Sequence, residues 1–458
     1  MERLRKVSHQ AASNTMLVLF ARRPSPGAGK RRLAAQLGDQ LAHTINSSMY
    51  ASALDDLNRW PGPAAVALTG AAGQPPVEIS ADPSNRIQQQ QRITLQQPDG
   101  SFGQRLKFVD DTLRLAHKGP VLFIGSDAPE LSEAFYQAAA EQLRDHDVVL
   151  APATDGGVTL LGANGPWPDL TELPWGSDQL CTALEALCIV AGLSVARMPL
   201  SADVDTLDDI LRLRSSLKGD TRPKQKLLLA ELQTALPDLG VAIPVKDDHV
   251  AALALTAELQ VQGVDHILII DQQSNAELRA YCRNNNIGYT QHTGSRGERL
   301  DIAARQLNDA NLWFLHADAQ LMPGAANAVR QQLITHDGGC FAFQFSTGSP
   351  PLARWLAKII NWRARHFMAY GDQGIFVRRK AYLDSGGFAH EPLFEEVPLI
   401  KALKQQGRFT LLDMPIIVAN RRWQKDGWLR RTLHNRWLVI RYILGGSPEM
   451  LAKDYTRR

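Results

Sequence analysis

Two stretches of the sequence decide the expected fold: VLFIGSD at residues 121–127 and LWFLHAD at residues 312–318. In each, a short apolar run is followed within three residues by an aspartate, Asp127 or Asp318. Such runs are typical of strands buried on both faces, as in a parallel sheet. Ligands of open α/β sheets bind at the carboxyl ends of the strands. A carboxylate there suits a divalent cation that bridges to a diphosphate, which predicts two domains of the kind that bind nucleotide sugars.

The composition is that of an ordinary globular protein. The chain has 458 residues, enough for two or three domains, and is 44% hydrophobic and 21% charged. Its four cysteines show neither a C-x-x-C pair nor the spacing of a zinc site, so we expect reduced thiols in a cytoplasmic protein. No apolar run approaches the ~20 residues that span a bilayer. The apolar run at residues 16–21 is too short for a signal peptide.

Strand and helix patterns alternate in both halves of the chain, which indicates βαβ units and largely parallel sheets. In the first half we expect strands at residues 16–21, 64–69, 121–124 and 147–151, and helices at 31–57, 103–116, 132–144, 179–191 and 205–217. In the second half we expect strands at 240–245, 266–271 and 312–315, and helices at 249–262, 276–284 and 299–307. The domains are expected at 1–216 and 239–458, joined by a linker at 217–238 that contains a short helix at 226–236.

The segment FARRPSPGAGKRRL, residues 20–33, joins the first expected strand to its helix and favours phosphate binding. Its glycines allow the backbone to approach a phosphate, and its five cations supply charge. We expect Arg22, Gly27, Lys30 and Arg32 to contact the phosphates. A Walker A loop is excluded because proline replaces the first glycine and Arg31 replaces the Ser or Thr that would hold magnesium. The alternative is a flexible basic turn.

Acidic turns follow the other apolar runs of the first half. They contain Asp127, Asp155 with its two following glycines, Asp203 and Asp205. Each aspartate alone is explained by a structural role, such as an Asx turn or a helix cap; Thr206-x-x-Asp209, for example, resembles a capping box. Together they favour a shared site in which Asp127, Asp203 and Asp205 hold a metal and Asp155 contacts the ligand.

Five segments of the first half together resemble the signature of a bacterial family. They are residues 20–33, 125–129, 155–157, 175–177 and 203–206, and the resemblance covers most of residues 14–215. The family comprises GT-A-like proteins related to sugar-nucleotide and other nucleotidyltransferases, often described as arsenosugar-biosynthesis-type glycosyltransferases. The sequence differs at Arg31, where threonine is usual, and at Val158, where an aromatic residue is usual. The resemblance implies a GT-A domain with nucleotidyl- or glycosyltransferase character.

The second half carries its own ordered set of motifs. They are Lys246-Asp247-Asp248, Asp271, Arg296, His316-Ala317-Asp318, GDQGIFVRR at 371–379, GGF at 386–388 and Glu395-Glu396. This set resembles the family-2 glycosyltransferases, and closely the subgroup that often accompanies the first family, over residues 240–456. The implied fold of the whole chain is therefore α/β, with two tandem GT-A domains whose Rossmann-like sheets are mostly parallel.

The resemblance implies a metal-dependent inverting glycosyltransferase that uses a nucleotide-sugar donor. Mg²⁺ or Mn²⁺ on Asp318 would neutralise the charge that develops on the leaving diphosphate. Asp247 and Asp271 would hydrogen-bond the nucleoside. Glu396 would be the base that takes the proton of the acceptor hydroxyl.

The remaining site residues follow from the same resemblance. Arg296 and Gln373 are expected to bind the donor, and Glu395 and Asp372 to act beside Glu396. The family usually has Asp in place of Glu396, and Asn-Glu at 247–248. The alternative for Glu395-Glu396 is a favourable acidic first turn of the helix that runs through Leu403.

The C-terminal part of the chain is basic. The net charge is only +3, yet residues 340–458 carry 20 Lys and Arg against 9 Asp and Glu, which indicates an anionic surface or ligand. Segments 352–370 and 421–442 also contain Trp, Leu and Ile. They are either helices that lie on the inner face of the membrane and receive a lipid-linked acceptor, or helices that pack on the domain or a partner; we favour packing. No nucleic-acid-binding module matches, so nucleic acid is not an expected partner.

Two other functions fit the same motifs. The first half could transfer a nucleotidyl group to a sugar phosphate or similar acceptor, with release of pyrophosphate. Alternatively, the chain could be a nucleotide-sugar-binding scaffold with degenerate sites. The sequence does not define the donor base, the sugar, or whether the acceptor is a sugar, a lipid or another small molecule.

Overall fold

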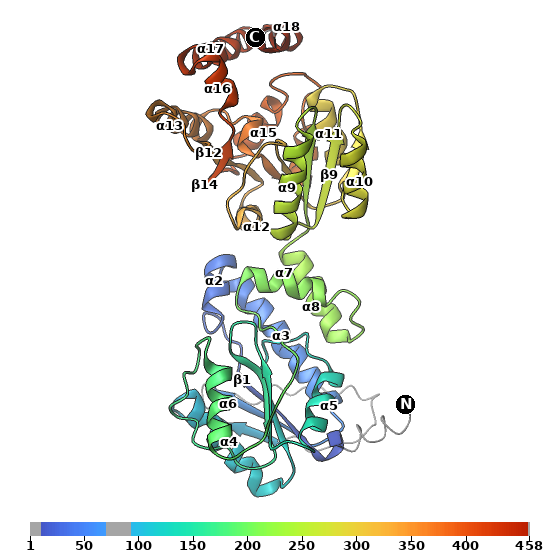
Figure 1. Cartoon of the computed structure of the whole chain (residues 1–458), viewed down its shortest axis with the longest axis vertical. Helices are drawn as coiled ribbons and strands as arrows, with labels where there is room; N and C mark the ends of the chain where they lie inside the picture. The colour runs from blue at the N-terminus through green and yellow to red at the C-terminus, as the bar shows by residue number, and fades with distance from the viewer. Residues whose placement is uncertain (1–10, 70–92, 457–458) are drawn as a thin grey trace. The chain divides into compact units, whose positions relative to one another are not determined.

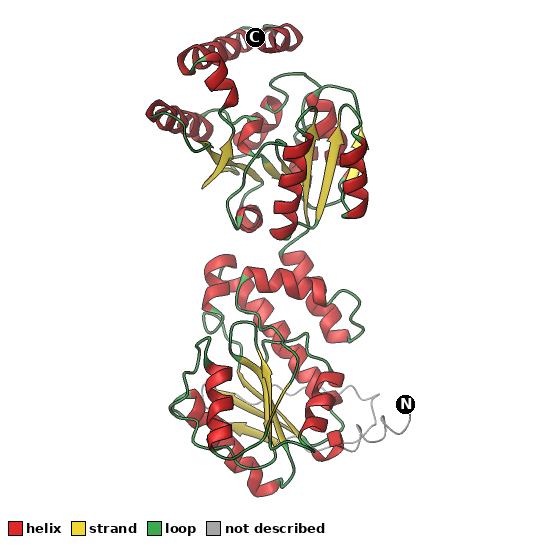
Figure 2. Ribbon diagram, viewed as in Figure 1, coloured by secondary structure: helices red, strands yellow, loops and turns green. Residues whose placement is uncertain are grey.

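The two halves of the chain fold separately. The computed structural model describes residues 11–69 and 93–456, and the chain divides into two units, Met1–Leu232 and Gln233–Arg458. Figure 1 shows the elements of each unit, and Figure 2 shows that both combine a sheet with surrounding helices.

The first unit is built on a seven-stranded sheet of order β3-β2-β1-β4-β6-β5-β7. Strand β6 is antiparallel to both of its neighbours, and the other pairs are parallel. The strands are β1 (Met16–Arg22), β2 (Ala64–Thr69), β3 (Ile93–Gln96), β4 (Val121–Ile124), β5 (Val148–Pro152), β6 (Val158–Ala163) and β7 (Val195–Arg197).

The second unit repeats this topology strand for strand. Its seven-stranded sheet has the order β10-β9-β8-β11-β13-β12-β14, and β13 is the antiparallel strand. The strands are β8 (Leu239–Val245), β9 (His266–Asp271), β10 (Gly288–Gln291), β11 (Asn311–Phe314), β12 (Gly338–Phe345), β13 (Phe376–Arg378) and β14 (Phe409–Val418). The predicted class, two tandem α/β domains with mostly parallel sheets, is confirmed.

Helices cover both faces of the first sheet. They are α2 (Arg31–Leu37), α3 (Asp39–Arg59), α4 (Phe102–Ala116), α5 (Glu133–Gln142), α6 (Leu180–Val190), α7 (Leu207–Ser216) and α8 (Pro223–Ala235). Alternate residues of β1 enter two apolar cores, Leu17 and Leu19 on the side of α3 and α5, and Met16 and Val18 on the side of α4 and α6. Successive side chains of a strand point to opposite faces of the sheet. Because both faces are buried here, the strand appears in the sequence as a continuous apolar run.

Two sequence expectations for the first unit change. The helix expected at 31–57 is broken at Gly38, whose φ of 86° lies in the left-handed region and ends α2 before α3 begins. The expected linker contains a full helix, α8, in which Leu228 and Leu232 are buried.

In the second unit, α9, α10 and α12 pack on one face of the sheet, and α11, α14 and α15 on the other. The helices are α9 (His249–Val261), α10 (Ala276–Asn284), α11 (Arg296–Gln306), α12 (Ala325–Thr335), α13 (Pro351–His366), α14 (Arg379–Asp384), α15 (Val397–Gln405), α16 (Arg421–Asp426), α17 (Trp428–Ile443) and α18 (Pro448–Thr456), with a 3₁₀ turn η1 (Gly371–Gln373). Helix α11 begins three residues earlier than expected because Ser295 and Glu298 form a capping box.

The amphipathic helix α13 packs on its own domain, as favoured from the sequence, and also presents apolar residues to solvent. Its side chains Ala353, Leu356 and Ala357 are buried in a cluster with β12. Trp355 and Trp362 on the same helix are each 58% exposed. Among the described residues, no helix combines the length and apolar character needed to cross a membrane. Membrane contact through this surface stays a prediction.

A buried ion pair fixes the start of α8 to the body of the first unit. Arg222 donates to both carboxylate oxygens of Asp56, at 3.0 and 3.1 Å, and to the carbonyl oxygens of Pro129 and Leu131. Asp56 is 5% exposed, and its burial raises its pKa to about 6 although Arg222 opposes the shift. Arg222 therefore holds the loop that follows Asp127 as well as the helix.

Replacing Arg222 with methionine should destabilise the first unit by about 3 kcal/mol, because it leaves Asp56 buried without its partner. The melting temperature of that unit should fall by roughly 6–12 °C in a calorimetric scan of the intact chain. Lys224→Met, two residues further on at an exposed position, is the control and should change stability by no more than about 0.5 kcal/mol. Equal melting temperatures for the two variants would show that the ion pair does not stabilise the unit.

Candidate functional site

The loop between β1 and α2 bends sharply. Gly27 and Gly29 have φ values of 72° and 83°, and Lys30 has a φ of 40°. Glycine adopts such values freely, whereas a lysine in the left-handed region is strained and must be held by its surroundings. The loop therefore fixes the direction of the Lys30 side chain.

The Lys30 ammonium lies among the aspartates that the sequence singled out. Its Nζ is 2.8 Å from Asp205 and 3.4 Å from Asp127. Burial lowers the pKa of Lys30, but Asp127 and Asp205 more than offset this and leave it raised. The pKa of Asp203 is raised to about 6 by burial and by the neighbouring Asp155, Asp127 and Asp205. All four predicted aspartates thus form one electrostatic group.

Backbone contacts hold this group together. The Val204 N–H donates to the Asp127 carbonyl oxygen at 2.9 Å, which joins two of the acidic loops. The Asp155 carboxylate accepts from the Gly157 N–H at 2.9 Å, the Asx turn considered as its structural role. Thr206 and Asp209 form the anticipated capping box at the start of α7. The structural roles considered for these short turns are therefore present, and a role toward a ligand stays a prediction.

The charge balance of this group suits a cation. Four carboxylates face one ammonium, and a divalent ion would compensate the excess. Within residues 11–69 and 93–456, no three His, Cys, Asp or Glu side chains are already arranged to hold a metal. Metal binding at Asp127, Asp203 and Asp205 stays a prediction.

A cavity of about 450 Å³ adjoins the group and has an aromatic wall. The rings of Phe20 and Phe102 lie 5.1 Å apart, and those of Phe102 and Trp175 4.5 Å apart. Arg22 lines this cavity, whereas Arg32 is exposed on α2 and does not. No sequence pattern pointed to Phe102, which follows the helix-capping Ser101. Aromatic faces beside charged loops suit a stacked base or sugar.

In the second unit, Arg296 joins several of the predicted site residues. It is the first residue of α11, its Nη1 bonds Glu395, and its Nη2 lies 2.6 Å from the Nε2 atom of His316. A Cβ at Gly371 would lie 2.8 Å from the guanidinium, so the glycine leaves room for the Arg296 side chain in this position. The ends of α11 and β11 and the turn η1 therefore meet at one edge of the sheet.

Glu395 and Glu396 are almost completely buried, at 2% and 4% exposure. The preceding Phe394 has a φ of 65°, and its ring packs against Tyr442 at 4.7 Å and Tyr370 at 5.8 Å. A bulky residue in the left-handed region is strained, and such strain concentrates at functional sites. The aromatic packing holds the two carboxylates in place.

The two carboxylate oxygens of Glu396 differ in their hydrogen bonding. Oε1 accepts from the Gly371 N–H at 3.1 Å, while Oε2 is buried and has no hydrogen-bond partner among the described residues. Burial, with a contribution from Glu395, raises the pKa of Glu396 to about 8. Helix α15 begins only at Val397, and Glu396 makes no side-chain capping bond there. The first-turn explanation of this pair is therefore not supported.

Asp372 and Asp318 lie close enough to interact electrostatically. Burial raises the pKa of Asp372, and its Oδ1 atom is buried with no partner in the described part of the chain. A half-buried Asp318 with a neighbouring unpartnered carboxylate oxygen is a donor set that suits Mg²⁺ or Mn²⁺. Gln373 differs from its expected role: its amide bonds the Phe341 carbonyl and the Tyr370 N–H, so it is buried and structural.

Asp271 and Asp247, the predicted nucleoside contacts, have different environments. Asp271 is fully buried and accepts from the Gln273 and Asn275 N–H groups and the Tyr289 hydroxyl. Burial alone would raise its pKa, but these bonds lower it. Asp247 is exposed, and Gln273 donates to it at 2.8 Å. Asp271 thus shapes the loop that positions Asp247, and of the two only Asp247 has an exposed side chain.

Comparisons with known proteins match part of this chain to a protein family. Residues 57–177, less than half of the chain, match the model of a family described as an uncharacterized protein conserved in bacteria, DUF2064. No curated protein matches the sequence. A solved structure from Desulfovibrio desulfuricans G20, described as a nucleotide-diphospho-sugar transferase, is 23% identical over 49% of this chain and 96% of its own, with a TM-score of 0.44.

Structures of TarS from S. aureus are also similar. The complex of residues 1–349 with UDP-GlcNAc is 13% identical, with a TM-score of 0.33, and the match covers 40% of this chain and 58% of that one. The complex with UDP is 15% identical, with a TM-score of 0.34, and covers 40% and 60%. This chain therefore spans less than two-thirds of the TarS fragment.

Proposed function

We propose that the second unit is a metal-dependent inverting glycosyltransferase that moves a sugar from a nucleoside diphosphate to an acceptor hydroxyl. The observation that carries this proposal is the buried Oε2 atom of Glu396, which lacks a hydrogen-bond partner in the described residues. Glu396 lines a cavity that Arg296, His316 and Asp372 also line. An unpaired buried carboxylate oxygen is costly, so its retention supports a role toward a ligand.

The proposed reaction is one displacement. Glu396 accepts the acceptor's proton on Oε2, the hydroxyl oxygen bonds the anomeric carbon, and the bond from that carbon to the diphosphate breaks. The electron pair leaves on the nucleoside diphosphate, and attack from the opposite face inverts the configuration. Asp318 and Asp372 would hold a divalent cation, which when bound supplies positive charge for the leaving diphosphate. Arg296 fixes Glu395 and so keeps the acidic segment in position.

The experiment is a transfer assay with the intact protein, in which the released nucleotide and the anomeric configuration of the product are measured. Nucleoside diphosphate release with an inverted product supports the proposal. A product that retains the donor's configuration would contradict the mechanism, and release of pyrophosphate alone would contradict the reaction class.

The pH dependence of kcat/KM should report the ionisation of Glu396. Only the unprotonated carboxylate can accept the hydroxyl proton, and its pKa is raised to about 8. The rate should therefore rise with pH, by up to about tenfold per unit, until it levels off near pH 8. Initial rates measured between pH 6 and 9 at constant ionic strength test this. A flat profile over that range would exclude Glu396 as the base.

A second candidate activity belongs to the first unit and is supported by the aromatic wall beside Lys30. We propose that this cavity binds a nucleotide, with its base against Phe102 and Trp175 and its phosphates near Lys30 and Arg22. Nucleotidyl transfer there would release pyrophosphate when a nucleoside triphosphate is supplied with a sugar phosphate. Binding without any turnover in either unit would favour the scaffold alternative.

A further inference from the structure

The cavity next to Glu396 has a volume of about 540 Å³, and two helices of the C-terminal region form its walls. Residues of α13 and α17 line it, together with the loops that carry Asp372 and Glu396. These segments are far apart in the sequence but lie in the same part of the second unit (Figure 1).

Most of the wall is hydrocarbon. It includes Leu356, Ile359 and Ile360 from α13 and Leu438, Val439 and Ile440 from α17. Charged residues also line the cavity: Arg296, Glu395 and Glu396 at the site loops, Arg363 on α13 and Arg436 on α17. Wherever a hydroxyl group of a polyhydroxylated acceptor met the hydrocarbon part of the wall it would stay unpaired, which is costly. A hydrocarbon chain there would gain free energy with each buried methylene.

The reactive end supplies an independent observation. Glu396 is 4% exposed, and its Oε2 atom has no partner among the residues that the structure describes. A ligand hydroxyl group, which can both donate and accept a hydrogen bond, would give this atom a partner in either protonation state of Glu396. The cavity therefore combines an unpaired oxygen of Glu396 with an extensive apolar lining.

We propose that the acceptor is an amphiphilic alcohol whose hydroxyl meets Glu396 and whose hydrocarbon body lies between α13 and α17. The proposal rests on the proposed glycosyl transfer and specifies the acceptor class. The rim supports it, because Trp362 and Ile440 line the cavity and are still 58% and 55% exposed. The apolar path thus continues from the buried carboxylate to the surface.

Binding of simple alcohols tests the acceptor class without a donor or turnover. The intact chain is titrated calorimetrically with 1-butanol, 1-hexanol and 1-octanol, and with sorbitol as a polar alcohol. The association constant should rise about threefold to fourfold for each added methylene, and sorbitol should bind far more weakly than octanol. Equal affinity for butanol and octanol, or tighter binding of sorbitol, would overturn the proposal.

Two matched pairs of variants locate the binding. Ile440→Glu places a carboxylate on the wall, whereas Ile443→Glu changes a 75% exposed residue of the same helix that does not line the cavity. Trp362→Glu and Trp355→Glu form the same comparison on α13, where both residues are 58% exposed. Octanol affinity should fall about tenfold in the first member of each pair and stay within twofold in the second. Equal effects within both pairs would place the binding elsewhere.

The result is separable from the proposed function. Octanol binding at this cavity without nucleoside diphosphate release from any donor would contradict glycosyl transfer and leave an amphiphile-binding site. Transfer to a polar acceptor, without octanol binding, would contradict the acceptor class alone.

Discussion

Replacing Glu396 with glutamine is expected to lower kcat by roughly 10²–10⁴-fold, because an amide cannot accept the proton of the acceptor hydroxyl. Glutamine has nearly the same size, and Gly371 can still donate to its side-chain oxygen, so the fold should be unaffected. Donor affinity should also be preserved, because the base acts on the acceptor. Nucleotide release under saturating donor, together with donor binding by calorimetry, separates the two effects.

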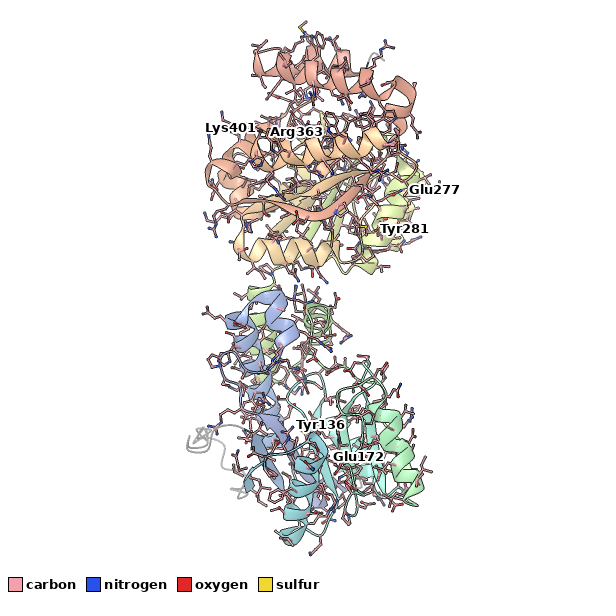
Figure 3. All side chains as sticks on the ribbon, turned by 90° about the vertical axis from the view of Figure 1, so that its left-hand side faces the viewer. Tyr136, Glu172, Glu277, Tyr281, Arg363 and Lys401 are labelled. Atoms are coloured by element: carbon pink, nitrogen blue, oxygen red, sulfur yellow. The ribbon has the colours of Figure 1, made fainter. Side chains whose placement is uncertain are left out.

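The matched control is Glu277→Gln. Glu277 is exposed in the first turn of α10 (Figure 3), so its loss should cost no more than about 1 kcal/mol of stability and leave kcat unchanged. If Glu396→Gln retained the wild-type kcat, Glu396 would not be the base. If it lost donor binding instead, the residue would have a role in the donor site.

Replacing Arg296 with methionine is expected to destabilise the second unit by about 3 kcal/mol, because it leaves Glu395 buried without its ion-pair partner. The melting temperature of that unit should fall by roughly 6–12 °C. Arg296 also lowers the pKa of Glu396. Its removal should therefore move the rise of kcat/KM to higher pH, which a purely structural role would not do.

Arg283→Met is the control, since Arg283 is exposed on α10. The double variant Arg296→Met/Glu395→Gln should regain much of the lost stability, because it removes the uncompensated charge as well. Additive losses in the double variant, or an unchanged pH profile in the single one, would contradict the assigned contacts of Arg296.

Local sequence patterns predicted the central strands, because a buried strand can be recognised from its own apolar residues. An apolar run followed by a turn with an aspartate gave the ends of β4 and β11, and alternation with helices gave the sheet class. The short strands β3, β7 and β10 carry little apolar signal, and the antiparallel β6 and β13 each also pair with a strand, β4 or β11, that is not their neighbour in the sequence. The repeated topology was therefore not readable from sequence similarity between the halves.

The sequence predicted which motifs contribute residues to the two sites, but not how those residues contact one another. The grouping of four aspartates follows from strand ends that share one edge, which the sequence supports. Contacts between segments that are distant in the sequence could not be predicted from it. They include the contacts of Arg296 with His316 and of Phe102 with Trp175, and the aromatic packing that holds Phe394 in the left-handed region. The buried roles of Asp271 and Gln373 were also missed, because burial depends on packing across the whole unit rather than on neighbouring residues.

The most direct test of the central claim is nucleotide release by the intact chain and two variants. The protein is incubated with UDP-, GDP-, ADP- and dTDP-sugars, with magnesium or manganese, and with a cell extract as the source of acceptors. Asp318→Ala and Asp127→Ala are assayed beside it. We predict that nucleoside diphosphate release is lost in Asp318→Ala and kept in Asp127→Ala, which would place glycosyl transfer in the second unit. Release that is lost in Asp127→Ala and kept in Asp318→Ala would contradict the account.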